Sequence, residues 1–193
     1  MDFVSSMRRS FSRIMTDVVF MKSALAVLLV VIICGGSGVT SAADSERPCS
    51  SPGCSQFDFW IGEWNLTWTS KDGKPETGEN RVSKILGGCV IREEFSRGKG
   101  EFTGMSVSAF SPGTQQWKQT WVDNGGGYLD FVGEFTHNRM VLQRKANREG
   151  KEFLQRMQWY NITTNTLDWN WERSDDNGTT WVLLWRIHYE RKS

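Results

Sequence analysis

The residues best suited to chemistry in this chain are polar side chains that alternate with apolar ones. Cys89, Ile91, Glu93 and Phe95 are spaced two apart, and side chains at that spacing share one face of a strand. A carboxyl group among apolar neighbours has a raised pKa and can serve as a general acid or base. No nucleophile–base pair or phosphate-binding loop accompanies Glu93, so the sequence assigns no catalytic residue. A cavity enzyme of the isomerase or cyclase type, with Glu93 as its acid and base, remains an alternative.

Further alternating segments place amides beside aromatic rings. Gln119 lies between Trp117 and Trp121, and a second segment aligns Phe153, Gln155, Met157 and Trp159. A few polar groups on a face of Trp and Met predict a cavity for a small hydrophobic or aromatic molecule. The alternative is a filled interior in which these groups bond one another, or a solvent-facing surface. The predicted ligand-binding residues are Glu93, Trp117, Gln119, Trp121, Met157 and Trp159.

Metal ligands are scarce in the sequence. Only His137 and His188 are available, and neither has ligand spacing to the cysteines, so we expect no metal and no cofactor. Cys49 and Cys54 flank the turn pair Pro52-Gly53, and an oxidising compartment would favour a disulfide between them. Two unpaired thiols are the alternative.

The alternating segments are short and follow one another with turn residues between them, which predicts an all-β fold. No long helical period interrupts them. About ten strands joined by hairpins form an up-and-down antiparallel meander, and closing it into a β-barrel removes the exposed edges. The expected strands are 63–70, 79–86, 88–96, 101–110, 115–123, 128–135, 138–145, 152–160, 166–173 and 179–190.

The first 43 residues have the pattern of a signal peptide. Lys22 precedes an apolar run that is short for a membrane span, and small residues end it at Ala43. We therefore expect a signal peptide over 1–43, a polar leader over 44–56 and the barrel over 57–193. The predicted location is the periplasm or the medium, with no membrane span after processing. Met21 as the true start, a twin-arginine signal at Arg8-Arg9 and an uncleaved anchor remain alternatives.

The nearly balanced net charge of the chain gives little information about its binding partners. The chain has 23 basic and 22 acidic residues without a basic block, which argues against nucleic acid as a partner. A structural module of the cell envelope is the third function class, and the oligomeric state is not encoded in any visible pattern.

Gly62-x-Trp64 at the start of the first strand resembles the entry signature of lipocalins and related calycin barrels. In those barrels the Trp closes the floor and an Arg from the last strand packs over it. The resemblance implies that Arg186 covers Trp64, a pairing that leaves no unpaired charge. A solvated Arg186 is the alternative. With Arg186 at the floor, His188 would also face inward.

The segment Ser174-x-Asp176-x-Gly178-x-Thr180-Trp181 resembles the Asp-box, a hairpin turn first known from sialidases. Asp and Ser side chains bond turn amides, Gly takes a positive φ and the Trp anchors the turn. Because a sialidase propeller needs several copies, we expect a structural role for Ser174, Asp176, Gly178 and Trp181.

Four motifs together resemble a bacterial, often exported family that is described as lipocalin-like. These motifs are the opening F-D-F-W-x-G-x-W at 57–64, I-L-G-G-C-V at 85–90, W-x-Q-x-W-V-D at 117–123, and the Asp-box. The resemblance spans about residue 57 to the C-terminus. It implies a lipocalin-like (calycin) barrel and carries no activity or ligand.

Overall fold

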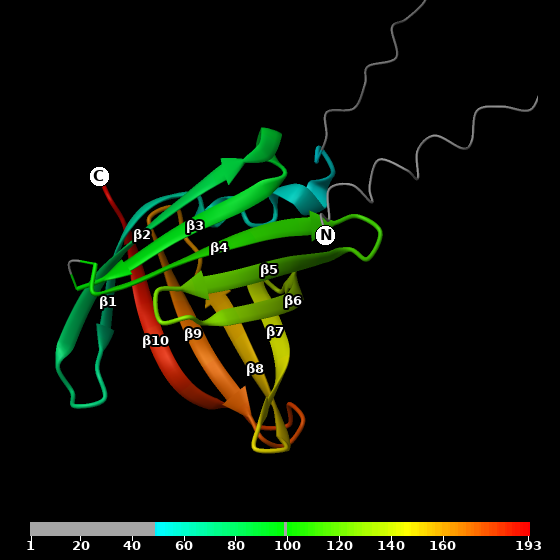
Figure 1. Ribbon diagram of the computed structural model, residues 1–193. Helices are drawn as coiled ribbons and strands as arrows, with labels where there is room; N and C mark the ends of the chain where they lie inside the picture. Colours follow the sequence, from blue (N-terminus) through cyan, green and yellow to red (C-terminus); the bar gives the residue numbers. More distant parts are fainter. Residues whose placement is uncertain (1–48, 99) are drawn as a thin grey trace, which may run out of the picture. The chain divides into compact units, whose positions relative to one another are not determined.

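The computed structural model describes residues 49–98 and 100–193, which form a closed antiparallel β-barrel (Figure 1). Each strand pairs with its neighbours in sequence, and the first strand pairs with the last, so no edge is left open. The expected signal peptide lies outside the described residues, as does the leader up to residue 48. The ten strands are β1 (Gly62–Thr69), β2 (Pro75–Ile85), β3 (Val90–Arg97), β4 (Phe102–Ser111), β5 (Gln116–Asp123), β6 (Tyr128–Thr136), β7 (Arg139–Arg148), β8 (Lys151–Tyr160), β9 (Thr166–Ser174) and β10 (Val182–Arg191).

The expected all-β, up-and-down barrel is thus confirmed, and the strand bounds differ most at the start of β2, the start of β10 and the end of β7, which extends to Arg148 rather than 145. β2 begins at Pro75 rather than 79, because Pro75 pairs with Thr69 directly after the turn. β10 begins at Val182 rather than 179, because the residues before it belong to the turn that follows β9. Three single-turn 3-10 helices complete the described chain: η1 (Pro52–Ser55), η2 (Asp58–Trp60) and η3 (Leu86–Gly88). None of the helices in the described part is long and apolar enough to cross a membrane.

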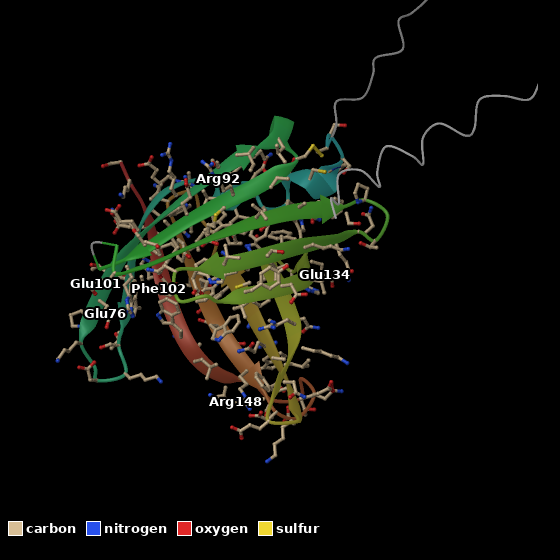
Figure 2. The ribbon with its side chains drawn as sticks, viewed as in Figure 1. Glu76, Arg92, Glu101, Phe102, Glu134 and Arg148 are labelled. Atoms are coloured by element: carbon tan, nitrogen blue, oxygen red, sulfur yellow. A yellow bond between two sulfur atoms is a disulfide. The ribbon has the colours of Figure 1, made fainter. Side chains whose placement is uncertain are left out.

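Alternation along the strands separates an aromatic interior from a polar exterior. In β1, Trp64, Leu66 and Trp68 are buried while the residues between them are exposed. Outward side chains such as Arg92 and Glu134 surround the barrel (Figure 2). The interior is therefore built from every second residue of each strand, and most of these residues are large and apolar.

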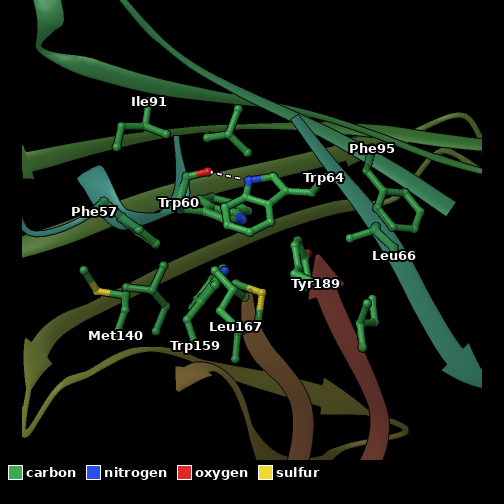
Figure 3. Packing of buried hydrophobic residues seen from close by; sticks show 14 of the residues in the cluster. Phe57, Trp60, Trp64, Leu66, Ile91, Phe95, Met140, Trp159, Leu167 and Tyr189 are labelled. Atoms are coloured by element: carbon green, nitrogen blue, oxygen red, sulfur yellow. Dashed lines mark hydrogen bonds between the residues drawn. The ribbon is translucent and has the colours of Figure 1, made fainter. Parts of the chain in front are cut away.

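An aromatic plug closes one end of the barrel, which we call the floor. Phe57 precedes η2 and its ring centre lies 5.2 Å from that of Trp60. It also meets Trp117 and Trp159 edge-on, each at 5.1 Å. Figure 3 shows Phe57, Trp60 and Trp159 of this plug. All four rings are almost fully buried. Edge-to-face and offset contacts at this spacing are the favoured arrangements of aromatic rings, so the plug is both dense and specific.

Arg191, and not Arg186, covers Trp64 at the floor. The Arg191 guanidinium carbon lies 4.1 Å from the centre of the Trp64 ring. Arg191 Nη1 also donates to the Ile61 carbonyl at 2.7 Å. Gly62 is required beside it, because a Cβ there would collide with Nη1 and its φ is +141°. An arginine of the last strand therefore covers the Trp of the first strand, but it is a different arginine from the one expected.

The expectation for Arg186 was wrong because β10 presents its other face to the interior. Ile187 and Tyr189 are buried inside, so Arg186 and His188 point outward. Arg186 Nε donates to the Asn170 side chain at 3.2 Å. His188 is half exposed and its Nδ1 lies 2.8 Å from an Asp168 carboxylate oxygen. An inward-facing His188 is likewise ruled out.

The disulfide also differs from the expected pair. Cys49 is bonded to Cys89 across a separation of 40 residues, and Cys54 is a buried thiol. Pro52–Ser55 winds into η1, which turns Cys54 toward the interior, where its Sγ lies 3.2 Å from Ser51 Oγ. The bond therefore ties the segment before the plug to the start of β3, and the prediction of a Cys49–Cys54 loop was wrong.

The loop between β9 and β10 is held by its own side chains. Ser174 Oγ donates to Asp176 at 2.7 Å and accepts from the Gly178 amide at 2.7 Å. Asp176 also accepts the Thr180 amide at 2.8 Å, and Trp181 Nε1 donates to the Gly178 carbonyl at 3.1 Å. Bonds from the Thr180 hydroxyl and amide hold the pKa of Asp176 at about 2. Ser174, Asp176, Gly178 and Trp181 thus have contacts that close this loop.

Candidate ligand-binding cavity

A cavity of about 270 Å³ lies inside the barrel, next to the aromatic plug. Nine of its fourteen lining side chains are aromatic, and polar groups other than indole N–H come only from Glu93, Gln119 and Tyr189. Phe102, labelled in Figure 2, contributes from the start of β4. The remaining lining residues are Phe95, Trp121, Leu129, Phe131, Met157, Trp159, Trp169, Trp171, Trp185 and Ile187.

Five of the six residues predicted to bind a ligand meet at this cavity. Glu93 comes from β3, Gln119 and Trp121 from β5, and Met157 and Trp159 from β8, so three separate strands converge. Their inward direction follows from alternation, and barrel closure brings the three strands around one space.

Trp117 is the exception, because it belongs to the floor. It stands at the beginning of β5, is almost fully buried, and packs against Phe57 and Phe110. Its Nε1 donates to the side-chain oxygen of Gln56 at 3.1 Å. A ring that is enclosed by the plug and satisfied by Gln56 supports the cavity from below and does not line it.

The residues of the wall formed by β9 and β10 were not among those predicted to bind a ligand. Trp169, Trp171 and Trp185 line the cavity, and their period-two spacing was the available signal. Trp169 is stacked parallel to Trp171 at 6.4 Å and meets Trp185 edge-on at 5.6 Å. Alternation indicated that Trp169 and Trp171 share a face but could not identify it as the inner one.

Glu93 is the centre of a buried polar cluster at the cavity wall. Asn80 Nδ2 donates to Glu93 Oε1 at 2.8 Å, and Ser106 Oγ donates to Oε2 at 2.7 Å. Asn80 Nδ2 also lies 3.3 Å from the Tyr189 hydroxyl oxygen. All four residues are buried and come from β2, β3, β4 and β10. The barrel therefore places one carboxyl group, with two fixed donors, against an aromatic chamber.

Burial controls the ionisation of this cluster. Loss of water raises the pKa of Glu93 to about 7, although the hydrogen bonds from Ser106 and Asn80 oppose that change. Burial, together with the nearby Glu93 charge, also raises the pKa of Tyr189 well above its ordinary value. Near neutral pH, both protonation states of Glu93 are therefore populated, while Tyr189 stays a neutral phenol.

Several polar atoms near the cavity have no hydrogen-bond partner within the protein. Trp159 Nε1 and Trp60 Nε1 are buried without an acceptor, and the Asn80 side-chain oxygen is buried without a donor. Gln119 is oriented by its bond to Ser108 Oγ at 3.0 Å. Of Trp60, Trp159 and Asn80, only Trp159 lines the cavity, so its indole N–H is the buried donor that a ligand or water in the cavity would pair with.

Close packing holds the ring of Trp121 in the wall. Gly104 faces it from β4, and a Cβ at that position would collide with the indole. Trp121 Nε1 donates at 2.9 Å to Asp123, the last residue of β5, whose carboxylate also accepts the Gly125 and Gly127 amides of the following loop. The contact with Gly104 and the hydrogen bond to Asp123 therefore determine how far this indole projects into the cavity.

Within residues 49–98 and 100–193, no group of three or more His, Cys, Asp or Glu side chains is arranged to hold a metal ion. Neither a known protein family nor a curated protein matches this chain. The fold and the cavity define the class of this protein, a closed ten-stranded up-and-down β-barrel that encloses an aromatic chamber with one buried carboxyl group.

Proposed function

We propose that this protein is an exported β-barrel that binds a small hydrophobic or aromatic molecule. The observation that carries the proposal is the internal cavity of about 270 Å³, lined almost entirely by aromatic and aliphatic side chains. A few placed polar groups in an apolar chamber are typical of small-molecule sites. Export is supported by the signal-like start of the sequence and by the Cys49–Cys89 disulfide, a bond that oxidising compartments favour.

The size of the cavity restricts the ligand. Sites for drug-sized molecules occupy about 300–1,000 Å³, and this cavity lies just below that range. A ligand with one or two rings therefore fits better than a long lipid or a tetrapyrrole. The edges and faces of the surrounding indoles favour a flat ring system.

The test uses 2-naphthalenemethanol, a neutral two-ring probe, in calorimetric titrations and in titrations that follow tryptophan fluorescence. The wild-type protein should bind it, and Leu129→Phe should weaken binding by adding a ring to the cavity lining. Val132→Phe is the matched control, because Val132 lies on the same strand and is exposed on the outer face. Absence of binding, or equal binding by both variants, would contradict the proposal.

The second candidate is a cavity enzyme in which Glu93 acts as the acid and base. The observation that favours it is a carboxyl group at the cavity wall with a pKa of about 7, since proton transfer is most efficient when the pKa is near the working pH. Such a site could move a proton between carbon atoms of a bound ketone, as an isomerase does.

Exchange of hydrogen for deuterium at the carbons beside the carbonyl of 2-tetralone tests the enzyme. The wild-type protein in D2O should accelerate exchange measured by NMR, and Glu93→Gln should remove the acceleration while the ketone still binds. An equal exchange rate with and without the wild-type protein would contradict the enzyme function, and only the binding function would remain. A structural envelope module is less favoured, because the chamber is not filled by its own side chains.

A further inference from the structure

We propose that the cavity selects a compact organic cation, such as an arylalkyl amine, whose ammonium group pairs with Glu93 while its ring lies among the indoles. This inference rests on the proposed ligand-binding function and specifies the chemical class of the ligand.

The charges around the cavity support a cation. Glu93 is the only lining residue that ionises near neutral pH, and no Lys, Arg or His lines the cavity. No salt bridge to Glu93 is formed by the described residues, because its two partners, Asn80 and Ser106, are neutral donors. Tyr189 is the only other titratable lining group, and it remains neutral. A buried carboxylate without a counter-ion is costly, and a cationic ligand would supply that counter-ion.

Hydrogen-bonding capacity around Glu93 also suits an ammonium group. An ionised carboxylate has about four acceptor sites, and Asn80 and Ser106 use one on each oxygen. An ammonium group has three N–H donors and no acceptor, so it complements this surplus of acceptors.

The aromatic walls add a second attraction for positive charge. The faces of Trp, Tyr and Phe rings are electron-rich, and cages of such rings bind ammonium groups. Trp169, Trp171 and Trp185 form one wall, in contact with each other at 5.6 and 6.4 Å. The chamber therefore combines two features that stabilise a desolvated cation, a carboxylate and several indole faces.

Arg144, which lies farther from the floor, carries the opposite charge. It would favour an anionic ligand, which is the outcome that competes with this proposal. Arg144 points inward beyond Phe131, with its guanidinium carbon 5.9 Å from that ring centre, and it donates to Gln155 at 3.3 Å. Its Nε is buried without a partner. Arg144 does not line the cavity, so we assign the charge preference to Glu93. An acid that reached Arg144 would reveal the reverse preference.

Three probes that share one ring system separate these outcomes: 2-naphthylmethylamine, 2-naphthalenemethanol and 2-naphthoate. Calorimetric titrations near pH 8 keep the amine protonated and Glu93 ionised. The amine should bind about tenfold or more tightly than the alcohol, which corresponds to one ion pair and its ring contacts. Glu93→Gln should abolish that preference, so that the amine and the alcohol bind the variant with similar affinity. Glu94→Gln, on the exposed face of the same strand, should leave the preference intact.

A measurement on the wild-type protein does not depend on the folding of Glu93→Gln. The affinity for the amine should fall as the pH is lowered through about 7, because protonation of Glu93 removes its charge, while the affinity for the alcohol should stay level. If the alcohol binds and the amine binds no more tightly, the proposed preference for a cation is wrong, but the proposed ligand-binding function still holds. Tightest binding of 2-naphthoate would overturn it in favour of Arg144. If no probe binds, the proposed function itself fails.

Discussion

The guanidinium group of Arg191 lies against the indole of Trp64, with 4.1 Å between the guanidinium carbon and the ring centre. This contact joins the last strand to the first, since Trp64 and Arg191 are paired across the β1–β10 ladder. Trp64 Nε1 in turn donates to the Trp60 carbonyl at 2.9 Å (Figure 3). The closure of the barrel and the position of the aromatic plug are therefore coupled through one pair of side chains.

Trp64 and Arg191 should show energetic coupling. Trp64→Ala should lower the free energy of unfolding by about 3–5 kcal/mol, the range for a buried aromatic residue. Arg191→Ala should cost about 1–3 kcal/mol through lost stacking and unpaired carbonyl groups. In denaturant melts the double variant should lose less than the sum of the two, because contacting residues couple. Arg186→Ala is the control and should be additive with Trp64→Ala. Coupling of Trp64 to Arg186 would contradict the observed closure.

The disulfide should be found between Cys49 and Cys89. Peptide mapping of the unreduced protein by mass spectrometry should recover these two cysteines in one linked fragment, with Cys54 alkylated only after unfolding. Cys89→Ser should lower the free energy of unfolding by up to about 4 kcal/mol, because the bond closes a loop of some 40 residues. Cys54→Ser leaves the bond intact and serves as the control. A fragment linking Cys49 to Cys54 would refute this arrangement.

Stability should decrease as the pH rises from about 4.5 to about 7. The pKa of Glu93 rises from 4.5 to about 7 in the folded state, so over this range the folded protein holds a proton that the unfolded chain has released. The contribution of Glu93 to the free energy of unfolding is fully present below pH 4.5 and is lost as the pH rises through about 7. The total loss is about 3 kcal/mol. Glu93→Gln should remove this decrease in denaturant melts at several pH values. A decrease of the same size in the variant would mean that another group causes it.

Gly104→Ala should impair ligand binding indirectly, because Gly104 does not line the cavity but packs against Trp121, which does. The added Cβ collides with the Trp121 indole, which must shift and strain its bond to Asp123. We expect weaker binding of 2-naphthalenemethanol and a changed near-UV circular dichroism spectrum. Gly113→Ala, where an added Cβ meets no atom within 4 Å, should have neither effect. Unchanged affinity in Gly104→Ala would show that Trp121 does not shape the binding site.

Asp176→Ala should loosen the loop between β9 and β10. Asp176 accepts bonds from the amide and hydroxyl of Thr180, at 2.8 and 2.6 Å. Without these bonds the Thr180 amide should exchange its hydrogen with solvent faster, as measured by NMR, because local opening costs less free energy. Asp175→Ala is the control, since Asp175 pairs with Arg173 instead. Equal exchange in both variants would argue against the hydrogen bonds between Asp176 and Thr180.

The sequence alone determined which residues share a face and where the chain turns, because alternation and turn residues act locally. That was enough to predict a ten-stranded meander and to group Glu93 with Ile91 and Phe95, or Gln119 with Trp121. For these segments the local pattern and the final fold agree.

Which face lies inside, and which distant residues meet, was decided only by the tertiary structure. Arg186 and Arg191 are both on β10, and the pairing of β10 with β1 and β9 selects Arg191 for the floor. Cys49 bonds to Cys89, which directly precedes β3 and is 40 residues away in sequence, while Cys54 is buried within η1. The Glu93 cluster needs four strands in register, with Asn80, Ser106 and Tyr189 contributed by strands other than its own. Period-two spacing carries no information about such long-range contacts, because register and closure depend on the packing of the whole interior.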